Sequence, residues 1–157
     1  GSNVGVGLNS FNNIIASHVV HHPVPLMYAC VSMVYRGVFD KWKDLRIAFM
    51  EGGCAWTVLL LDRIARDQQL MGGLPRSFDD YLTGGQILVG CEGEDASLPY
   101  LAGRVGIEPF AYSSDYPHEV DYKAAVHEID ETLESTELSD EHKAAVLGLN
   151  AQRFFRL

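Results

Sequence analysis

Phe110-Ala111-Tyr112-Ser113-Ser114-Asp115-Tyr116-Pro117-His118 is the stretch that decides the fold. Its apolar start predicts a short buried strand over Phe110–Ser113, and Pro117 then stops the chain from continuing a ladder of backbone hydrogen bonds. The strand therefore delivers the carboxylate of Asp115 to its C-terminal end. In a parallel α/β fold this is the end of the sheet at which the chemistry takes place.

Two further strands are predicted upstream, and each also ends in an acid. Leu45–Met50 reads as a strand that runs into Glu51, and Ile87–Cys91 reads as a strand that runs into Glu92. Parallel strands bring their C-terminal ends to one edge of the sheet. We therefore expect Glu51, Glu92 and Asp115 to converge.

Helical periodicity separates these strands. It predicts helices at 26–37, 54–67 and 96–105, then a helix over Asp121–Leu133 and a final helix capped by Ser139. Residues 1–23 read as a loop-like segment with one helical turn near 11–17, and residues 68–80 read as a second loop. Alternating strands and helices predict a parallel sheet with right-handed crossovers. Three strands are too few for a closed (β/α)8 barrel, which needs about 250 residues.

The composition indicates one ordinary globular domain over residues 1–157. Apolar residues make up 47% of the chain and charged residues 21%, and the net charge of −9 argues against nucleic acid or an anionic membrane as the partner. The three cysteines lack a CxxC spacing, so a reduced, cytoplasmic setting is expected. We expect no signal peptide and no membrane span, since the apolar run Val58–Leu61 is far too short to cross a membrane.

The converging acids, with histidines nearby, predict either a divalent-metal site or acid–base chemistry. A metal lowers the pKa of bound water, and crowded carboxylates raise one another's pKa. Simpler interpretations remain open for each residue. Glu92, Glu94 and Asp95 can begin a helix, Glu51 can bond to amides of its own turn, and Asp115 can form a turn. Loop hydrogen bonding can likewise account for the histidines at 18, 21 and 22.

Several segments resemble one known family. Residues 37–53, GVFDKWKDLRIAFMEGG, resemble the GVFxxxPxLRxxFxEGG block of the amidohydrolase-related family, which includes enzymes similar to aminocarboxymuconate-semialdehyde decarboxylase. Residues 114–118 resemble its SDYPH block, residues 148–154 resemble its GNAxRxF ending, and His22-Pro23 resembles the HP that opens the preceding helix. The order of these motifs is that of the family, and they span nearly the whole chain.

The resemblance implies a (β/α)8 TIM barrel of which this chain forms about strands six to eight. It also implies one divalent metal, zinc or manganese, and a small carboxylated substrate that is hydrolysed, hydrated or decarboxylated. Asp115 matches the family's acid after the last strand, a metal ligand and base. Glu51, the second catalytic candidate, stands where the decarboxylase branch has a catalytic His. We assign His118, Glu92 and His22 to substrate binding.

Three hypotheses follow. In the first, the chain is the C-terminal half of a metal-dependent hydrolase, or alternatively of a decarboxylase, and is inactive alone because the family's HxH pair and its next metal His belong to earlier strands. In the second, it is a half-barrel whose open sheet edges pair with a copy of itself or with an N-terminal half. In the third, it is a binding module that has lost the metal.

Overall fold

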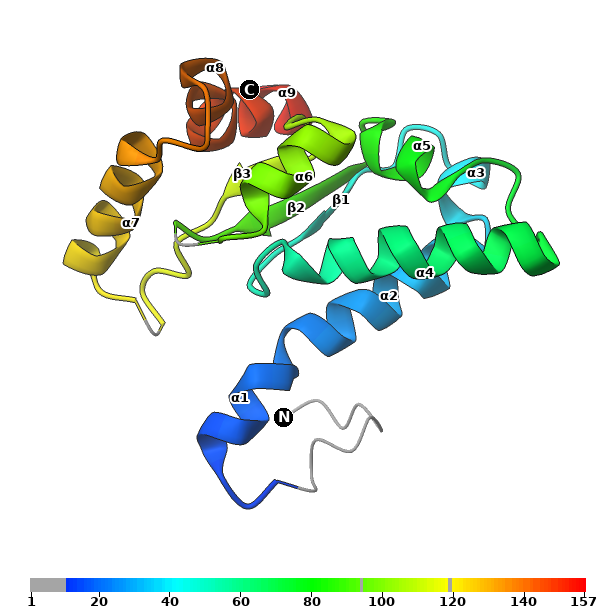
Figure 1. Ribbon diagram of the computed structural model, residues 1–157, viewed down its shortest axis with the longest axis horizontal. Coiled ribbons are helices and arrows are strands. Elements are labelled where there is room, and N and C mark those ends of the chain that lie inside the picture. Colours follow the sequence, from blue (N-terminus) through cyan, green and yellow to red (C-terminus); the bar gives the residue numbers. More distant parts are fainter. Residues whose placement is uncertain (1–10, 94, 119) are drawn as a thin grey trace.

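A three-stranded parallel sheet lies at the centre of the protein (Figure 1). The computed structural model describes residues 11–93, 95–118 and 120–157. The strands are β1 (Ile47–Phe49), β2 (Ile87–Cys91) and β3 (Phe110–Tyr112), in the order β1-β2-β3. The pairs Phe49↔Val89 and Cys91↔Tyr112 set the register. The predicted α/β class, the parallel strands and the position of all three are confirmed.

The central strand β2 is buried along its whole length and sends alternate side chains to opposite faces of the sheet. Ile87 and Val89 join the main core with α2 (Pro23–Tyr35), α4 (Ala55–Met71) and α6 (Leu98–Val105). Leu88 faces the other way and packs with Phe154 of α9 (Asn150–Phe155). The sheet is therefore covered by helices on one face and by the C-terminal helix on the other.

The C-terminal region forms a continuous run of helices after α7 (Tyr122–Glu134). It consists of α8 (Asp140–Ala144), the π-helical turn η2 (Ala145–Leu149) and α9. Asn150, buried at the start of α9, donates from its side-chain amide to the carbonyl oxygens of Ile107 and Phe110, each at 2.8 Å. These two bonds hold α9 against the start of β3.

Two segments expected to be loops are helical. The helical turn expected near 11–17 is part of a longer helix, since Ile14–His21 form α1 with Asn13 as its cap, and the loop predicted around that turn is wrong up to His21; residues 1–10 lie outside the described part. The predicted loop over 68–80 is wrong at both ends, because α4 continues to Met71 and α5 covers Phe78–Thr83. Ser77 and Asp80 form a capping box that begins α5. A short helix α3 (Val38–Lys41) also precedes β1.

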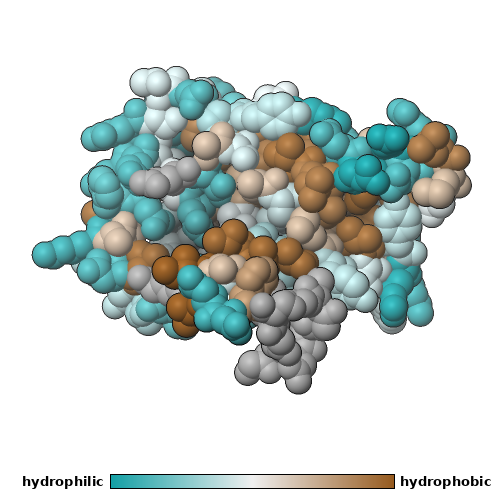
Figure 2. Space-filling model, turned by 60° about the horizontal axis from the view of Figure 1, so that its bottom comes forward, coloured by the Kyte–Doolittle hydropathy of each residue, from teal (hydrophilic) through white to brown (hydrophobic). Residues whose placement is uncertain are grey.

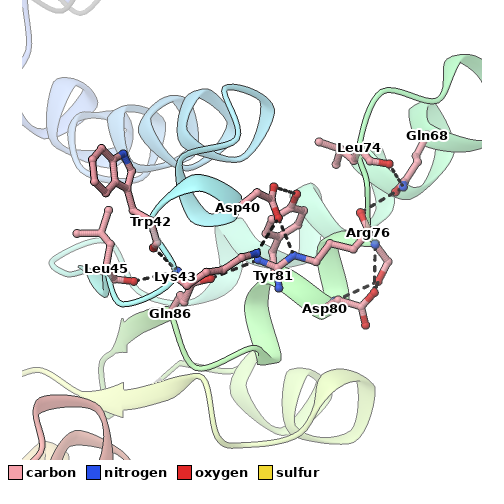
Figure 3. Close-up of polar contacts among 11 residues, drawn as sticks. Asp40, Trp42, Lys43, Leu45, Gln68, Leu74, Arg76, Asp80, Tyr81 and Gln86 are labelled. Carbon is pink, nitrogen blue, oxygen red and sulfur yellow. Dashed lines mark hydrogen bonds and ion pairs between the residues drawn. The ribbon is translucent and has the colours of Figure 1, made fainter.

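The N-terminal ends of the strands are tied together by a polar network centred on Asp40 and Arg76 (Figure 3). Asp40 of α3 accepts a hydrogen bond from the Tyr81 hydroxyl of α5, and its other oxygen lies 3.4 Å from Arg76 Nε. Gln86 receives a bond from Arg76 and donates to the carbonyls of Trp42 and Leu45, at 2.9 and 3.1 Å. The network closes the end of the sheet opposite the acids.

Helices α1 and α2 follow one another with only His22 between them. The 22-residue stretch Ile14–Tyr35 is long and apolar enough, by length and composition alone, to cross a membrane, and little of it is buried. The expectation of no membrane span rested on Val58–Leu61 and did not consider this stretch, which satisfies a criterion of length and composition only. Within this fold the stretch contacts α4 through α2. Mostly buried core helices of soluble proteins and N-terminal signal sequences satisfy the same criterion.

Candidate functional site

The three predicted acids meet at the C-terminal edge of the sheet. Glu51 follows β1, Glu92 follows β2 directly, and Asp115 follows β3 after two serines. All three line one cavity of about 160 Å³. His22 lines it as well, from the junction of α1 and α2. The convergence expected from parallel strands is thus present in the structure.

Glu51, Asp115 and His118 form the group best placed to hold a metal. Each offers one ligand atom, and these atoms lie within 4.8 Å of one another. His118 Nδ1 lies 3.1 Å from Asp115 Oδ1, so the imidazole and the carboxylate are already paired. Glu51 Oε2 lies 4.0 Å from His22 Nδ1 on the other side. Two carboxylates and an imidazole suit a divalent first-row metal, and three protein ligands leave a position open, as in catalytic sites.

The backbone at two of the three strand-end acids, Glu51 and Asp115, adopts an uncommon conformation. Glu51 has φ 63° and Asp115 has φ 54°, in the left-handed region that L-residues other than Gly seldom occupy. Such a conformation costs roughly 1–2 kcal/mol for a side chain with a Cβ. Strain of this kind concentrates at functional sites, where the geometry of a side chain matters more than the local cost.

The turn after β1 fits tightly against the beginning of α2, and glycine makes this possible. A Cβ on Gly52 would lie 2.6 Å from Leu26 Cδ1 and 3.5 Å from the main chain of His22 and Pro23. The absence of a side chain therefore lets the turn approach the helix. As a result, Glu51 and His22 face each other across the cavity.

Glu92 is exposed and lies among other carboxylates. Partial desolvation of its carboxyl group raises its pKa, and Asp95, Glu128 and Asp115 raise it further. Nearby, burial and Glu128 raise the pKa of Tyr112 to about 12, and the Tyr112 hydroxyl lies 3.2 Å from Glu128 Oε2. Glu92 is thus suited to retain a proton at a pH at which an exposed Glu has lost it.

Four residues of the cavity wall are not among the site residues assigned from the sequence: His18, Ser114, Val120 and Glu128. His18 of α1 and His22 at the junction of α1 and α2 lie four residues apart, with ring centroids 5.1 Å apart, a spacing that is informative once α1 is known to be helical. Glu128 comes from α7, and no local pattern points to it. His118 contacts Asp115 but is not among the residues of the cavity wall.

The cavity wall carries four carboxylates and two imidazoles, and no Lys or Arg among the described residues that line it. Such a surface favours a cation. An anionic substrate group approaching it would need a positive charge from a metal or from outside these residues.

A family model described as amidohydrolase matches residues 12–157. No curated protein is significantly similar to the chain in sequence. Solved structures do match. Amidohydrolase map2389c from Mycobacterium avium subsp. paratuberculosis K-10 is 19% identical with a TM-score of 0.78, over 98% of this chain and 40% of that one.

Two further solved structures share the fold. The 5-carboxyvanillate decarboxylase LigW from Sphingomonas paucimobilis is 24% identical with a TM-score of 0.59, over 82% of this chain and 38% of that one. The IDCase of Metarhizium anisopliae in apo form is 20% identical with a TM-score of 0.68, over 97% of this chain and 44% of that one. The chain therefore spans less than half the length of each of these three relatives, and its sheet corresponds to part of a TIM barrel.

Proposed function

The chain belongs to the amidohydrolase family, and on that premise we propose that it supplies the C-terminal part of a metal-dependent hydrolase site for a small carboxylated substrate. The observation that carries the proposal is the group formed by Glu51, Asp115 and His118, with ligand atoms within 4.8 Å of one another. These three residues would hold a divalent metal, zinc in the first instance and manganese as the alternative. Such a metal would polarise a substrate carbonyl and lower the pKa of water to about 7.

The residues around that group have distinct proposed roles. Asp115 would act as metal ligand and as the base that accepts a proton from water, and His118 Nδ1, 3.1 Å from Asp115 Oδ1, would hold that carboxylate in place. Glu92 would hold a proton for the leaving group, since its pKa is raised by burial and by three carboxylates. His22, beside Glu51, and His118 would contact the substrate.

Metal binding tests this proposal directly. We expect the purified chain to bind Mn²⁺ or Zn²⁺ weakly in calorimetric titration, because three ligands are fewer than a tight site uses. Asp115→Asn and Glu51→Gln should each weaken binding about tenfold or more. Asp140→Asn serves as the matched control, since Asp140 is a fully exposed carboxylate on α8 that does not line the cavity. Equal binding by all three variants and the parent chain would refute the site.

Decarboxylation is the second candidate, favoured by the likeness to LigW, whose name specifies that activity. Against it stands Glu51, at the position where the decarboxylase branch carries a catalytic His. Assaying a protein that also contains the remaining barrel strands for CO₂ release and for ester or amide hydrolysis would separate the two reactions. We expect hydrolysis there, and no turnover by this chain alone.

A partner surface is also part of the proposal. The sheet ends at β1 and at β3 within the described residues, and parallel sheets are normally covered on both faces and closed or protected at their edges. Figure 2, which brings the lower side of Figure 1 forward, shows hydrophobic side chains gathered in patches on that face. We propose that the remaining barrel strands, or a second copy of the chain, cover these surfaces.

A further inference from the structure

Asp95 links the two turns that carry Glu51 and Glu92. Its Oδ2 accepts the backbone N–H of Cys54 at 2.8 Å and the backbone N–H of Glu92 at 3.3 Å. Cys54 lies 41 residues earlier in the sequence, so the first bond joins the turn after β1 to the loop after β2. One carboxylate oxygen thus holds two neighbouring strand ends in a fixed relation.

The bond to Cys54 also replaces a missing helix cap. Cys54 precedes the 17-residue helix α4, and no side chain of its own turn caps that helix. The Asp95 carboxylate supplies the acceptor from another element, at the helix end where negative charge is favourable. The role first considered for Asp95, a helix-starting acid, is therefore fulfilled at α4.

Gly53 lets the carboxylate reach this position. Its φ is +60°, and a Cβ there would lie 3.0 Å from Asp95 Oδ2 and 3.3 Å from Asp95 Oδ1. Such distances are too short for an ordinary Cβ contact. A side chain at position 53 would therefore push the Asp95 carboxylate away, and glycine lets it pack against the turn. The tight contact leaves little freedom for the turn that presents Glu51.

We propose that Asp95 is a positioning residue, which fixes the relative placement of Glu51 and Glu92 by bonding to the backbone of both turns. This inference rests on the proposed metal site for its functional consequence, but the bonding itself does not depend on a metal. Asp95 does not line the cavity, so it acts through the two turns rather than by contact with a ligand. Residues that orient metal ligands in this way typically change metal affinity by about 10–100-fold when removed.

Three substitutions separate positioning from charge and from general stability. Asp95→Ala removes the acceptor and should weaken Mn²⁺ binding about tenfold or more. Asp95→Asn keeps one carbonyl oxygen able to accept both N–H groups, so its affinity should stay within about threefold of the parent. Asp95→Glu keeps the charge but displaces it from both amides. If Asp95→Ala does not fold, this variant replaces it, and its Mn²⁺ affinity should also fall below that of the parent chain.

Asp80→Ala is the matched control. Asp80 also accepts a backbone N–H, that of Ser77 at 3.1 Å, but it belongs to the capping box of α5 at the other end of the sheet. This variant should lower stability without changing Mn²⁺ affinity. A loss of affinity as large as that of Asp95→Ala would show that any weakened cap has the same effect, and would overturn the inference.

Amide hydrogen exchange provides a readout that needs no metal. Asp95→Ala should speed the exchange of the Cys54 and Glu92 amides about tenfold while Val89 in β2 keeps its protection. If the parent chain binds no Mn²⁺ but this local change occurs, the proposed metal site fails and the positioning role of Asp95 stands. If exchange at Cys54 and Glu92 is unchanged, or Asp95→Asn behaves like Asp95→Ala, the positioning role fails.

Discussion

Glu51 illustrates how one residue can be unfavourable for folding and useful for a site. Its φ of 63° would suit glycine, yet the position holds a glutamate. The carboxylate of Glu51 lies 4.0 Å from His22 and belongs to the group that Asp115 and His118 complete. A natural chain keeps such a residue when the side chain contributes something that stability does not measure. The same reasoning applies to Asp115 at the end of β3, with φ 54°.

The cost at Glu51 can be measured by comparing two substitutions. Glu51→Ala and Glu51→Gly both remove the carboxylate, but only glycine relieves the left-handed backbone. We expect the Gly variant to be about 1 kcal/mol more stable than the Ala variant in urea unfolding with a chelator present. Both should bind Mn²⁺ more weakly than the parent chain. Equal stability of the two variants would mean that the turn carries no strain.

Glu92 predicts a pH dependence of stability. Its pKa is raised in the folded state, first by burial and then by Asp95, Glu128 and Asp115, so the folded chain holds this proton more tightly than the unfolded chain does. The stabilisation is complete below the unfolded-state pKa and is lost as the pH rises through the folded-state pKa.

Glu92→Gln should therefore match the parent chain near pH 4 and become the more stable of the two by pH 8. Urea unfolding across that range, in chelator, measures the difference. Glu137→Gln is the control, because Glu137 is an exposed carboxylate outside the cavity. A constant difference between Glu92→Gln and the parent chain at all pH values would contradict the shifted pKa.

At the scale of elements, the two ends of the sheet have different tasks. Acids, histidines and strained turns gather at the C-terminal end, whereas the N-terminal end carries the Asp40–Arg76 network (Figure 3). Within that network Arg76 also lies over the Tyr81 ring, 4.0 Å from its centroid. In barrels of this type the N-terminal end serves stability.

Asp40→Ala tests this division. It leaves the Tyr81 hydroxyl and Arg76 without their shared acceptor, and should cost about 2 kcal/mol of unfolding free energy. Mn²⁺ affinity should not change, because Asp40 lies at the opposite end of the strands. Lys43→Ala is the control, since Lys43 is two-thirds exposed and its 3.6 Å pair with Asp40 should contribute less than about 1 kcal/mol. A reduced metal affinity in Asp40→Ala would show that the two ends are coupled.

The sequence allowed the strands and their terminal acids to be predicted because both depend on local patterns. An apolar run followed by an acid and a turn residue marks β1, β2 and β3 alike. Helix α5 was missed although Ser77-Phe78-Asp79-Asp80 carries a capping box, since the helix is only six residues long. The π-helical turn η2 was not predicted either, because no capping box or similar local pattern marks its start.

Long-range features of the site could not be predicted in the same way. The local pattern indicates only one turn of α1, because the histidines that follow it read as a polar loop, and it does not identify His18 as a residue of the cavity. Glu128 reaches the cavity only because α7 packs beside the strand ends, and Asp95 bonds to Cys54 across 41 residues. Local periodicity does not encode such contacts, which depend on how the elements pack.

For the whole molecule, the main physical problem is uncovered apolar surface. Ile14, Ile15 and Val19 on α1 are 85%, 71% and 69% exposed, and Tyr28 on α2 is 67% exposed. A single exposed apolar residue is normal, but a cluster on adjoining helices indicates a contact surface. The relatives of known structure are more than twice as long as the chain, which is consistent with further strands and helices covering this side.

We therefore expect the chain not to remain a monomer in solution. Sedimentation velocity at micromolar concentration should show a dimer or larger species, or a complex once the remaining barrel strands are supplied. Ile15→Glu and Val19→Glu should shift the population toward monomer, because burying an unpaired carboxylate opposes association. Tyr122→Glu is the matched control, since Tyr122 is a 72% exposed aromatic residue that belongs to α7 and not to α1 or α2. A well-folded monomer at all concentrations would argue against the partner surface, while leaving the strand-end site to be judged by its metal binding.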